Sequence, residues 1–286
     1  MKALVTGCRG QLGAAVALIP PKGWQVAALA RDELDIGDPV AVLAAVAAAA
    51  PDLIVNAAAY TAVDRAETEP DAALRVNRDG ARHLAMAATE IGARLVHVST
   101  DYVFDGRAGR PYRPDDAPNP LNVYGASKLA GERAVMKAAP NALIIRTAWV
   151  YSANHPNFVN TMLTLMRRGA NLTVVADQIG TPTSCITLAR AIWDLASLGA
   201  SGVHHVTDAG VASWYDFACA IAEEAVAAGI LDRAPAIVPV NTSERPSPTT
   251  RPAFGVLDKS DTWRLLAATA PHWRQSLREV LSTVTT

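Results

Sequence analysis

The chain has 286 residues, half of them hydrophobic, so it is long enough for one large domain or two smaller ones with a real core. Its formal net charge of −1 gives no electrostatic reason to expect a nucleic acid or an anionic membrane as partner. Three widely spaced cysteines (Cys8, Cys185 and Cys219) favour neither a disulfide framework nor a metal site, and no apolar segment fits a signal peptide or a membrane span, so we expect a soluble, cytoplasmic protein.

Up to about residue 150, short apolar segments alternate with longer segments of helical pattern. Such alternation is typical of a doubly wound parallel sheet, the Rossmann type of α/β fold. Continuous apolar segments such as Leu53-Ile54-Val55 fit strands that are buried on both faces. The predicted strands are Ala3–Val5, Gln25–Leu29, Leu53–Asn56, Leu95–Ser99 and Leu143–Arg146, and the predicted helices are Leu12–Ile19, Pro39–Ala49, Asp71–Ile91 and Tyr124–Ala138.

The first predicted strand is followed at once by a glycine-rich turn, Thr6-Gly-Cys-Arg-Gly-Gln-Leu-Gly13, and then by a helical segment. Gly7 permits the tight turn, Gly10 lets the backbone approach a pyrophosphate, and Gly13 allows the helix to pack closely on the strand. The N-terminus of that helix would face the phosphates with its free N–H groups. Glycines in this context predict a dinucleotide site.

Tyr124 and Lys128 are four residues apart in a predicted helix and therefore lie on one face of it. A phenol is a poor proton donor at neutral pH, but a fixed cation nearby lowers its pKa. Carbonyl reduction needs such a donor, because the alkoxide formed by hydride delivery must be protonated. In most proteins a Tyr–Lys pair on a helix is a surface feature. The predicted dinucleotide site earlier in the chain favours a catalytic role for this pair.

Beyond residue 150 the alternation becomes irregular. We predict a helix over Ser184–Leu198, a strand over Val203–Val206 and a helix from Ser213 to about residue 228. The Ser213 hydroxyl is expected to cap the last helix, with Asp216 completing a capping box.

These patterns predict two domains. Residues 1–150, completed by about 184–207, would form the dinucleotide-binding domain with the parallel sheet. Residues 151–183 and 208–286 would form a smaller C-terminal cap that binds the substrate and includes a proline-rich loop over residues 242–252. Ligands of such sheets bind at the carboxyl ends of the strands, so the cap is expected to lie over those ends.

Longer motifs surround the glycine turn and the Tyr–Lys pair. Through them the sequence resembles the extended short-chain dehydrogenase/reductases and, within that group, the dTDP-4-dehydrorhamnose reductases. The resemblance extends from the first strand to about Leu257. It is carried by Thr6–Gly13, Val55–Glu67, Val98–Gly106, Asn122–Glu132, Arg146–Tyr151, Asn157-Phe158, Asp177–Thr183 and Arg251-Pro252; the motifs around Ser99–Gly106 and Asp177–Thr183 are specific to this branch.

The resemblance implies reduction of the C4 keto group of dTDP-4-dehydro-6-deoxy-L-mannose to dTDP-L-rhamnose by hydride transfer from NAD(P)H, in the synthesis of polysaccharide precursors. It assigns catalysis to Thr100, Tyr124 and Lys128. Thr100 would bond the substrate oxygen beside Tyr124, and Lys128 would lower the pKa of Tyr124 and bond the nicotinamide ribose. Asn77 is expected either as a packing amide or as a polar link behind Lys128.

The end of the second strand bears on the choice of cofactor. Folds that select NAD usually have an acid there. Here Arg31 comes first and could pair with a 2′-phosphate, so we expect NADPH to serve at least as well as NADH, while Asp32 leaves NADH open. The residues expected at the cofactor are Gly7, Gly10, Gln11, Leu12, Gly13, Arg31, Asp35, Ile36, Ala57, Ala58, Ala59, Tyr60, Tyr124 and Lys128, with Asp35-Ile36 resembling an adenine-binding pair.

Trp149 lies just past a predicted strand, where its flat ring could stack on a deoxysugar. By resemblance, Val63 lines the same pocket, and Gln178, Thr183 and Arg251 meet the nucleotide diphosphate. Arg251 would be a bidentate partner, with an ordinary surface position as the alternative. The residues expected at the substrate are Val63, Thr100, Asp101, Tyr102, Trp149, Gln178, Thr183 and Arg251.

One segment departs from the family pattern. Where the family usually has Arg-Pro-x-Asn-Ser-x-Leu, this chain has Arg251-Pro-Ala-Phe-Gly-Val-Leu257. Two polar positions of the cap, now Phe254 and Gly255, are therefore lost, and the contact of this loop with the nucleotide is left open.

Three other functions stay open at this point. Sugar-nucleotide dehydratases share the glycine turn and the Tyr–Lys pair, but they use Thr-Asp-Glu where this chain has Thr100-Asp101-Tyr102. A non-catalytic relative, of the type of the regulatory subunit of methionine adenosyltransferase, would bind dinucleotide without turnover; the intact Thr100, Tyr124 and Lys128 argue against it. A reductase of another 4-keto-6-deoxy sugar nucleotide is the third.

We expect no metal site. Some members of the family are dimers linked by magnesium that glutamates hold, one of them near the start of the helix after the Gly-x-Pro-Thr turn. In this chain that segment, Thr183–Arg190, contains no carboxylate, which magnesium prefers; Glu279 is the alternative. His204 and His205 are adjacent in a strand and point to opposite faces, so one is expected in the core and one exposed. We expect a monomer or weak homodimer.

Overall fold

The computed structural model describes residues 1–284. Its centre is a six-stranded sheet in which every strand pair is parallel. The strand order is β10-β5-β4-β3-β1-β2, so the order reverses between β1 and β3. The fold class predicted from the sequence is confirmed. The strands are β1 (Lys2–Thr6), β2 (Gln25–Leu29), β3 (Leu53–Asn56), β4 (Arg94–Thr100), β5 (Leu143–Thr147) and β10 (Gly202–His205).

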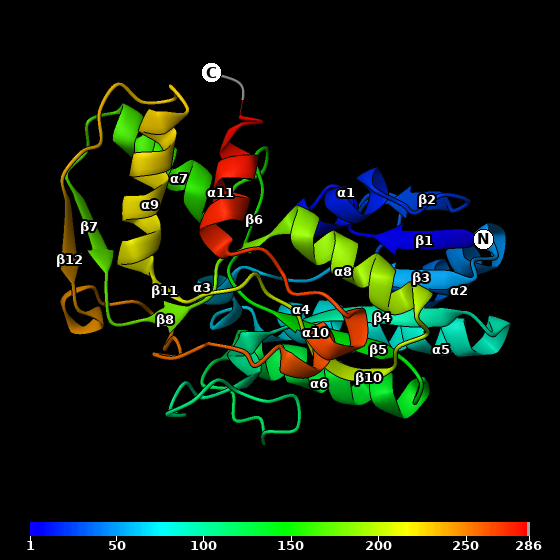
Figure 1. Cartoon of the computed structure of the whole chain (residues 1–286). Helices are drawn as coiled ribbons and strands as arrows, with labels where there is room; N and C mark the ends of the chain where they lie inside the picture. Colours follow the sequence, from blue (N-terminus) through cyan, green and yellow to red (C-terminus); the bar gives the residue numbers. More distant parts are fainter. Residues whose placement is uncertain (285–286) are drawn as a thin grey trace.

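Helices cover both faces of this sheet (Figure 1). On one face, α1 (Gln11–Leu18) and α8 (Cys185–Ser197) pack on the strands. On the other, α2 (Pro39–Ala49), α5 (Ala81–Ile91) and α6 (Val123–Ala138) do so. A short helix α4 (Pro70–Leu74) and a π-helical turn η1 (Arg75–Gly80) lead into α5 without a break.

The alternation of side chains along each strand explains why the sheet needs both layers. Ala3 and Val5 of β1 belong to the core cluster on the α1/α8 face, whereas Leu4 between them belongs to the cluster on the opposite face. Adjacent strand residues point to opposite faces, so a strand that is apolar at every position has to be covered twice. The doubly wound architecture follows directly from this uninterrupted hydrophobicity.

The second half of the chain adds a smaller layer beyond the carboxyl ends of the strands, at the left of Figure 1. Its core cluster contains residues of three helices and of a two-stranded parallel sheet. The division into the two predicted domains stays a prediction, and its last residues, 285 and 286, lie outside the described part of the chain. The elements are β6 (Val150–Tyr151), α7 (Phe158–Arg167), β7 (Leu172–Val175), β8 (Ile179–Gly180), β9 (Thr183–Ser184), β11 (Ala212–Ser213), α9 (Trp214–Ala227), β12 (Ile237–Val240) and α11 (Trp273–Leu281). Helix α10 (Ser260–Leu266) lies instead beside β10 of the large sheet, where Thr262 donates to the His205 carbonyl.

The predicted elements agree with the structure to within about one residue, apart from their grouping around α4 and α5. The capping box of α9 is confirmed: Ser213 accepts from the Asp216 N–H and Asp216 accepts from the Ser213 N–H. The predicted proline-rich loop contains a short 3₁₀ turn, Thr242–Glu244. Helices α7, α10 and α11 were not predicted. Within residues 1–284, no helix is both long and apolar enough to cross a membrane.

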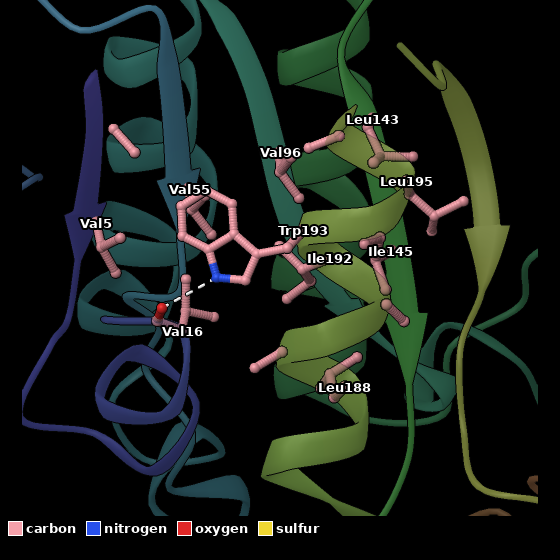
Figure 2. Close-up of a cluster of buried hydrophobic side chains, with 14 of the residues drawn as sticks. Val5, Val16, Val55, Val96, Leu143, Ile145, Leu188, Ile192, Trp193 and Leu195 are labelled. Carbon is pink, nitrogen blue, oxygen red and sulfur yellow. Dashed lines mark hydrogen bonds between the residues drawn. The ribbon is translucent and has the colours of Figure 1, made fainter. Parts of the chain in front are cut away.

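Trp193 joins the two helices of the α1/α8 face. Its ring is 2% exposed, and its indole N–H donates to the Val16 carbonyl at 3.0 Å (Figure 2). In an unbroken helix the N–H of residue 20 would bond this carbonyl, but residue 20 is a proline and has no N–H. The tryptophan therefore satisfies a buried acceptor that the sequence of α1 leaves open.

We predict that Trp193→Phe lowers the free energy of unfolding by about 1–3 kcal/mol, because the buried Val16 carbonyl loses its donor. Urea denaturation followed by circular dichroism measures this change. Leu198→Ala, at the end of the same helix and 58% exposed, is the control and should change the value by less than about 0.5 kcal/mol. Equal effects of the two substitutions would contradict this account.

Candidate active site

Polar side chains meet where β1, β3, β4 and β5 end. Thr6 donates to Asn56 Oδ1 at 2.9 Å, and the same oxygen accepts from the Ala58 N–H at 3.2 Å. Asn56 Nδ2 lies 3.1 Å from His97 Nδ1. Burial lowers the pKa of His97 well below its usual value, so this imidazole is neutral. These bonds fix the turn after β3 against the turn after β1.

The glycine turn has the geometry of a cradle. Gly7 has φ +72°, and a Cβ there would lie 2.8 Å from Ala58 Cα. A Cβ on Gly13 would lie 2.3 Å from the Gly7 carbonyl oxygen, so helix α1 begins against the turn at a distance that only glycine allows. Gly10 precedes α1 and is exposed. A flat backbone surface at a helix N-terminus fits a pyrophosphate.

Gln11 and Leu12, also expected at the cofactor, follow this turn. Gln11 Oε1 accepts from Ser152 at 3.0 Å and from Asn157 at 2.9 Å, so it joins the glycine turn to the loop after β6. Leu12 packs against the core cluster of the α1/α8 face.

The end of β2 carries an ion pair that the sequence-based interpretation missed. Arg9 of the glycine turn bonds the Asp32 carboxylate at 2.7 Å, with both side chains exposed. Arg31, next to Asp32, is exposed as well. Two guanidinium groups thus lie at the end of β2. Of the acids there, Asp32 is paired with Arg9, and Glu33 accepts from the Ala30 N–H at 2.8 Å. The signal was present in sequence as an arginine inside the glycine turn.

Asp35 and Ile36 lie in the loop after β2. Ile36 is a core residue, 3% exposed, and its carbonyl oxygen lies 3.1 Å from His83 Nδ1. Partial burial would raise the pKa of Asp35, but hydrogen bonds from Arg75 and from the Gly37 N–H outweigh it and hold the pKa below its usual value. The Asp35 carboxylate is therefore charged and committed to Arg75.

Ala57–Tyr60 continue from β3, and Asn77 of the π-helical turn holds their end in place. Its amide accepts from the Tyr60 N–H at 2.8 Å and donates to the Tyr60 carbonyl at 3.0 Å. It also donates to Ser127 Oγ at 2.9 Å, which donates to the Tyr124 carbonyl at 2.7 Å. Of the two alternatives for Asn77, the structure shows an amide that links the turn after β3 to α6, with Ser127 rather than Lys128 as its partner.

Thr100, Asp101, Tyr102 and Tyr124 gather at the carboxyl end of β4. Thr100 lies beside the Tyr124 phenol and donates to Asp101 Oδ1 at 2.9 Å. The rings of Tyr102 and Tyr124 pack edge to face, 5.5 Å apart. The structure thus brings together the hydroxyl, phenol and carboxyl groups that the sequence assigned to substrate and catalysis.

Lys128 is buried one turn after Tyr124, with 2% of its surface exposed. Its ammonium group donates to the Val98 carbonyl at 2.6 Å. Burial lowers the pKa of Lys128 to about 8, against the opposing charge of Glu132. Burial likewise raises the pKa of Tyr124 above its usual value. The expected lowering of that pKa by Lys128 is therefore not found here, because the ammonium is directed to the backbone of β4.

The sequence-based interpretation also missed a buried ion pair at Glu132, one helical turn after Lys128 on α6. Arg146 of β5 donates twice to Glu132 of α6, at 2.9 and 2.7 Å, and Ser99 donates to the same carboxylate at 2.5 Å. The two charged side chains are 4% and 5% exposed. The Arg146 guanidinium also lies 5.1 Å from the centre of the Phe104 ring. The pair fixes α6, which carries Tyr124, relative to β4 and β5.

Trp149 has an unusual conformation. Its φ is +48°, a left-handed value that costs a residue with a side chain roughly 1–2 kcal/mol. Its ring stacks on Trp214, with centroids 3.6 Å apart, and Gly180 packs against it so closely that a Cβ there would lie 2.5 Å from the ring. The indole is thus held between two neighbours. Stacking of a sugar on its face would require this pair to move, so its substrate role stays a prediction.

The remaining substrate residues lie in the cap, apart from Val63, which follows β3. Arg251 donates to both oxygens of Asp64 at 3.1 Å, and its charge lies near the Tyr102 phenol. Val63, half-buried, begins the short helix α3 (Val63–Ala66) beside this pair. Gln178 is 7% exposed and donates to Thr242 at 3.1 Å. Thr183 is fully buried and donates to the Thr181 carbonyl, so the structure does not bring its hydroxyl to the others.

The departure at Phe254-Gly255 has a structural explanation. Phe254 packs against a small apolar cluster that includes Leu129 and Leu257. A Cβ on Gly255 would lie 2.6 Å from Asp101 Oδ2. The loop thus contributes an apolar contact and a close backbone approach in place of two polar side chains.

The histidine pair divides as the strand geometry predicts: His205 is fully buried and His204 is only partly so. Burial lowers the pKa of His205 to about 3. Among residues 1–284, no group of three or more His, Cys, Asp or Glu side chains could hold a metal ion.

Comparison with known proteins gives the family. The family model described as the RmlD substrate binding domain matches residues 1–286. The chain belongs to this family. The resemblance found in the sequence is confirmed.

Relatives of this RmlD-family protein match it over nearly its whole length. It is 43% identical over 298 residues to the dTDP-4-dehydrorhamnose reductase of Burkholderia thailandensis, which covers 99% of this chain and 100% of that protein. It is also 43% identical to the spore coat polysaccharide biosynthesis protein SpsK of Bacillus subtilis, over 98% of this chain and 96% of that one. The crystal structure of dTDP-4-dehydrorhamnose reductase from Bacillus anthracis in complex with NADP is 35% identical, with a TM-score of 0.92 and 98% coverage of both chains.

Proposed function

We propose that this protein reduces the C4 keto group of dTDP-4-dehydro-6-deoxy-L-mannose to give dTDP-L-rhamnose, with NADPH as the preferred cofactor. The observation that carries the proposal is the cluster of Thr100, Asp101 and Tyr124 at the end of β4, beside the glycine cradle. The long matches to reductases of that name, one of them with NADP bound, give the substrate and cofactor.

The residues present fit a dinucleotide, because Gly7 and Gly13 let helix α1 begin directly against the end of β1, and the exposed Gly10 at its N-terminus can face a pyrophosphate. When bound, NADPH would supply the hydride. Thr100 would donate to the keto oxygen of the substrate and Tyr124 would give its proton to the oxygen as the charge develops. Lys128, whose pKa is about 8, is mostly protonated at neutral pH and would offer a hydrogen bond to the ribose.

The substrate would lie between the end of β4 and the cap. Tyr102, Val63 and Trp149 would contact the sugar, and Asp101 would act on it through Thr100. Gln178 and Arg251 would contact the diphosphate, and Thr183 would act from behind through the backbone of its turn. Arg251 supports the proposal because it is already held at Tyr102 by Asp64. We also propose that residues 1–150 with 184–207 bind the cofactor, and that the protein works in the cytoplasm as a monomer or weak homodimer without nucleic acid.

The alternatives differ at identified positions. A dehydratase needs a second acid next to Asp101, and Tyr102 occupies that place with a phenol whose pKa burial raises to about 12. A non-catalytic relative would bind the dinucleotide but show no turnover. A reductase of another 4-keto-6-deoxy sugar nucleotide would show a higher kcat/KM with that sugar than with the dTDP-linked L-sugar.

We predict that Tyr124→Phe lowers kcat by roughly 10²–10⁴-fold, the usual worth of a general acid. The assay generates the 4-keto-L-sugar nucleotide enzymatically and follows the absorbance of the reduced cofactor. Binding of NADPH, measured by fluorescence, should stay within a few-fold of the wild type. Tyr215→Phe, a half-buried phenol on helix α9 with no assigned role, is the control and should retain most activity. A Tyr124→Phe enzyme with near-normal kcat would refute the assignment.

The exposed guanidinium groups at the end of β2 predict the cofactor preference. Arg31→Ala should raise the KM for NADPH about tenfold or more, since one charged hydrogen bond to phosphate is lost, and leave the KM for NADH nearly unchanged. Arg9→Ala should act in the same direction and in addition free Asp32, which could then bond a ribose 2′-hydroxyl. Steady-state kinetics with both cofactors decide the question; equal changes for NADPH and NADH would exclude this role.

Metal should not be required. Neither the hydride step nor the proton from Tyr124 needs a cation, and Thr183–Arg190 has no carboxylate to bind magnesium. We predict full activity after exhaustive treatment with EDTA and no magnesium-dependent change of mass in light scattering. If activity is lost and magnesium restores it, carboxylates elsewhere, with Glu279 as the first to test, form a site.

A further inference from the structure

The carboxyl group of Asp101 is buried directly behind the Thr100 hydroxyl. The residue is 3% exposed, and its Oδ1 lies 2.9 Å from Thr100 Oγ1. Thr100 in turn lies beside Tyr124: burial raises the pKa of that phenol, and Thr100 opposes this effect. The buried acid, the Thr100 hydroxyl and the proposed proton donor are thus neighbours at the end of β4.

The other oxygen of Asp101 faces the backbone of the loop that departs from the family pattern. A Cβ on Gly255 would lie 2.6 Å from Oδ2, so this position has room for the carboxyl group only as glycine. The loop is fixed there, because the Gly255 N–H donates to the Ile179 carbonyl at 2.7 Å. Neither Phe254 nor Gly255 has a side-chain donor to offer Oδ2.

A carboxyl group in these surroundings keeps its proton to unusually high pH. Burial raises the pKa of Asp101 to about 7, although Thr100 and the backbone N–H groups of residues 101 and 102 oppose it. The titratable groups around it are the phenols of Tyr102, on the 3₁₀ turn η2 (Asp101–Val103), and of Tyr124 on α6. On the cap side, the guanidinium of Arg251 bonds Asp64 and lies near the Tyr102 phenol.

We propose that Asp101 acts in its neutral form as a positioning residue that keeps the Thr100–Tyr124 pair ready to donate. A neutral carboxyl group donates its O–H to Thr100 Oγ1, so that the Thr100 hydroxyl is free to donate to the keto oxygen of the substrate beside the Tyr124 phenol. This role rests on the proposed reduction.

During turnover the Tyr124 proton goes to the new alkoxide, and the phenolate takes one proton from solvent before the next cycle. Asp101 keeps its proton throughout, so the Thr100 hydroxyl stays directed at the substrate oxygen. An ionised Asp101 can only accept hydrogen bonds, so it would turn the Thr100 hydroxyl away from the substrate oxygen.

The test compares the pH dependence of kcat for the wild type, Asp101→Asn and Asp101→Ala. The wild type should lose activity as the pH rises through about 7. Asp101→Asn cannot ionise and can donate through Nδ2, so it should keep kcat within about tenfold at pH 6.5 and lose this fall. Asp101→Ala should lower kcat by about tenfold or more, the value of one hydrogen bond. An unchanged fall in Asp101→Asn would overturn the proposal.

A second measurement needs no substrate. Infrared difference spectra of the free protein, wild type against Asp101→Asn, should show a protonated carboxyl band that disappears as the pH rises through about 7; a band that is lost near the ordinary value of about 4 would overturn the proposal. Gly255→Ala should displace the carboxyl group and shift this titration. Gly109→Ala, where a Cβ meets nothing within 4 Å, should not.

The two proposals fail separately. Absence of turnover with every 4-keto sugar nucleotide at any pH, together with a carboxyl band that titrates near 7, would reject the reductase assignment and uphold the charge state of Asp101. Turnover with a band that titrates near 4 would uphold the reductase and reject the role of Asp101.

Discussion

Each central strand of the parallel sheet has helices against both faces, so its side chains can reach a ligand only where the strand ends. Thr6, Asn56 and Thr100 are the last residues of three neighbouring strands. Because all strands run in the same direction, these ends lie at one edge, and the glycine turn and the catalytic cluster are neighbours as a consequence of topology. Burial of the sheet thus determines where chemistry is possible before any individual residue is considered.

Because it is buried, the Glu132–Arg146 pair contributes more to the orientation of helix α6 than to the free energy of unfolding. Desolvation of two charges offsets most of their attraction, whereas removal of one partner typically costs about 3–5 kcal/mol. With Ser99 as a third partner, the pair binds one helix to two strands at a defined rotation. Tyr124, Lys128 and Glu132 are spaced by four residues along α6, so the position of the phenol depends on the anchoring of this carboxylate two turns away.

Much of the fold could be predicted from the sequence, because buried strands and glycine turns leave strong local patterns. The five strands before residue 150 and the capping box at Ser213 are of this kind. Contacts between residues that are far apart in the sequence could not be predicted. The Arg9–Asp32 and Arg146–Glu132 ion pairs are examples, because no periodic pattern in the sequence indicates which distant residues meet.

The orientation of side chains was a further limit. The spacing of Tyr124 and Lys128 predicted that they share a face, which is correct, but the ammonium bonds Val98. Trp149 was expected to offer a free ring, and its stacking on Trp214 depends on the cap, whose shorter elements have weak sequence signals. Rotamers and packing partners are tertiary properties, so the roles of these residues follow from the fold and not from the motif.

Strand β10 joins the sheet beside β5 only after the chain has passed through β6, α7, β7 and α8. During synthesis, a strand that is fully buried in the finished fold therefore stays an open sheet edge until more than fifty further residues have been added. Open edges of this kind pair readily with other chains. Because part of the cap lies between β5 and β10 in the sequence, the nucleotide-binding sheet is completed late and through nonlocal contacts. The cap and the sheet therefore have to fold together.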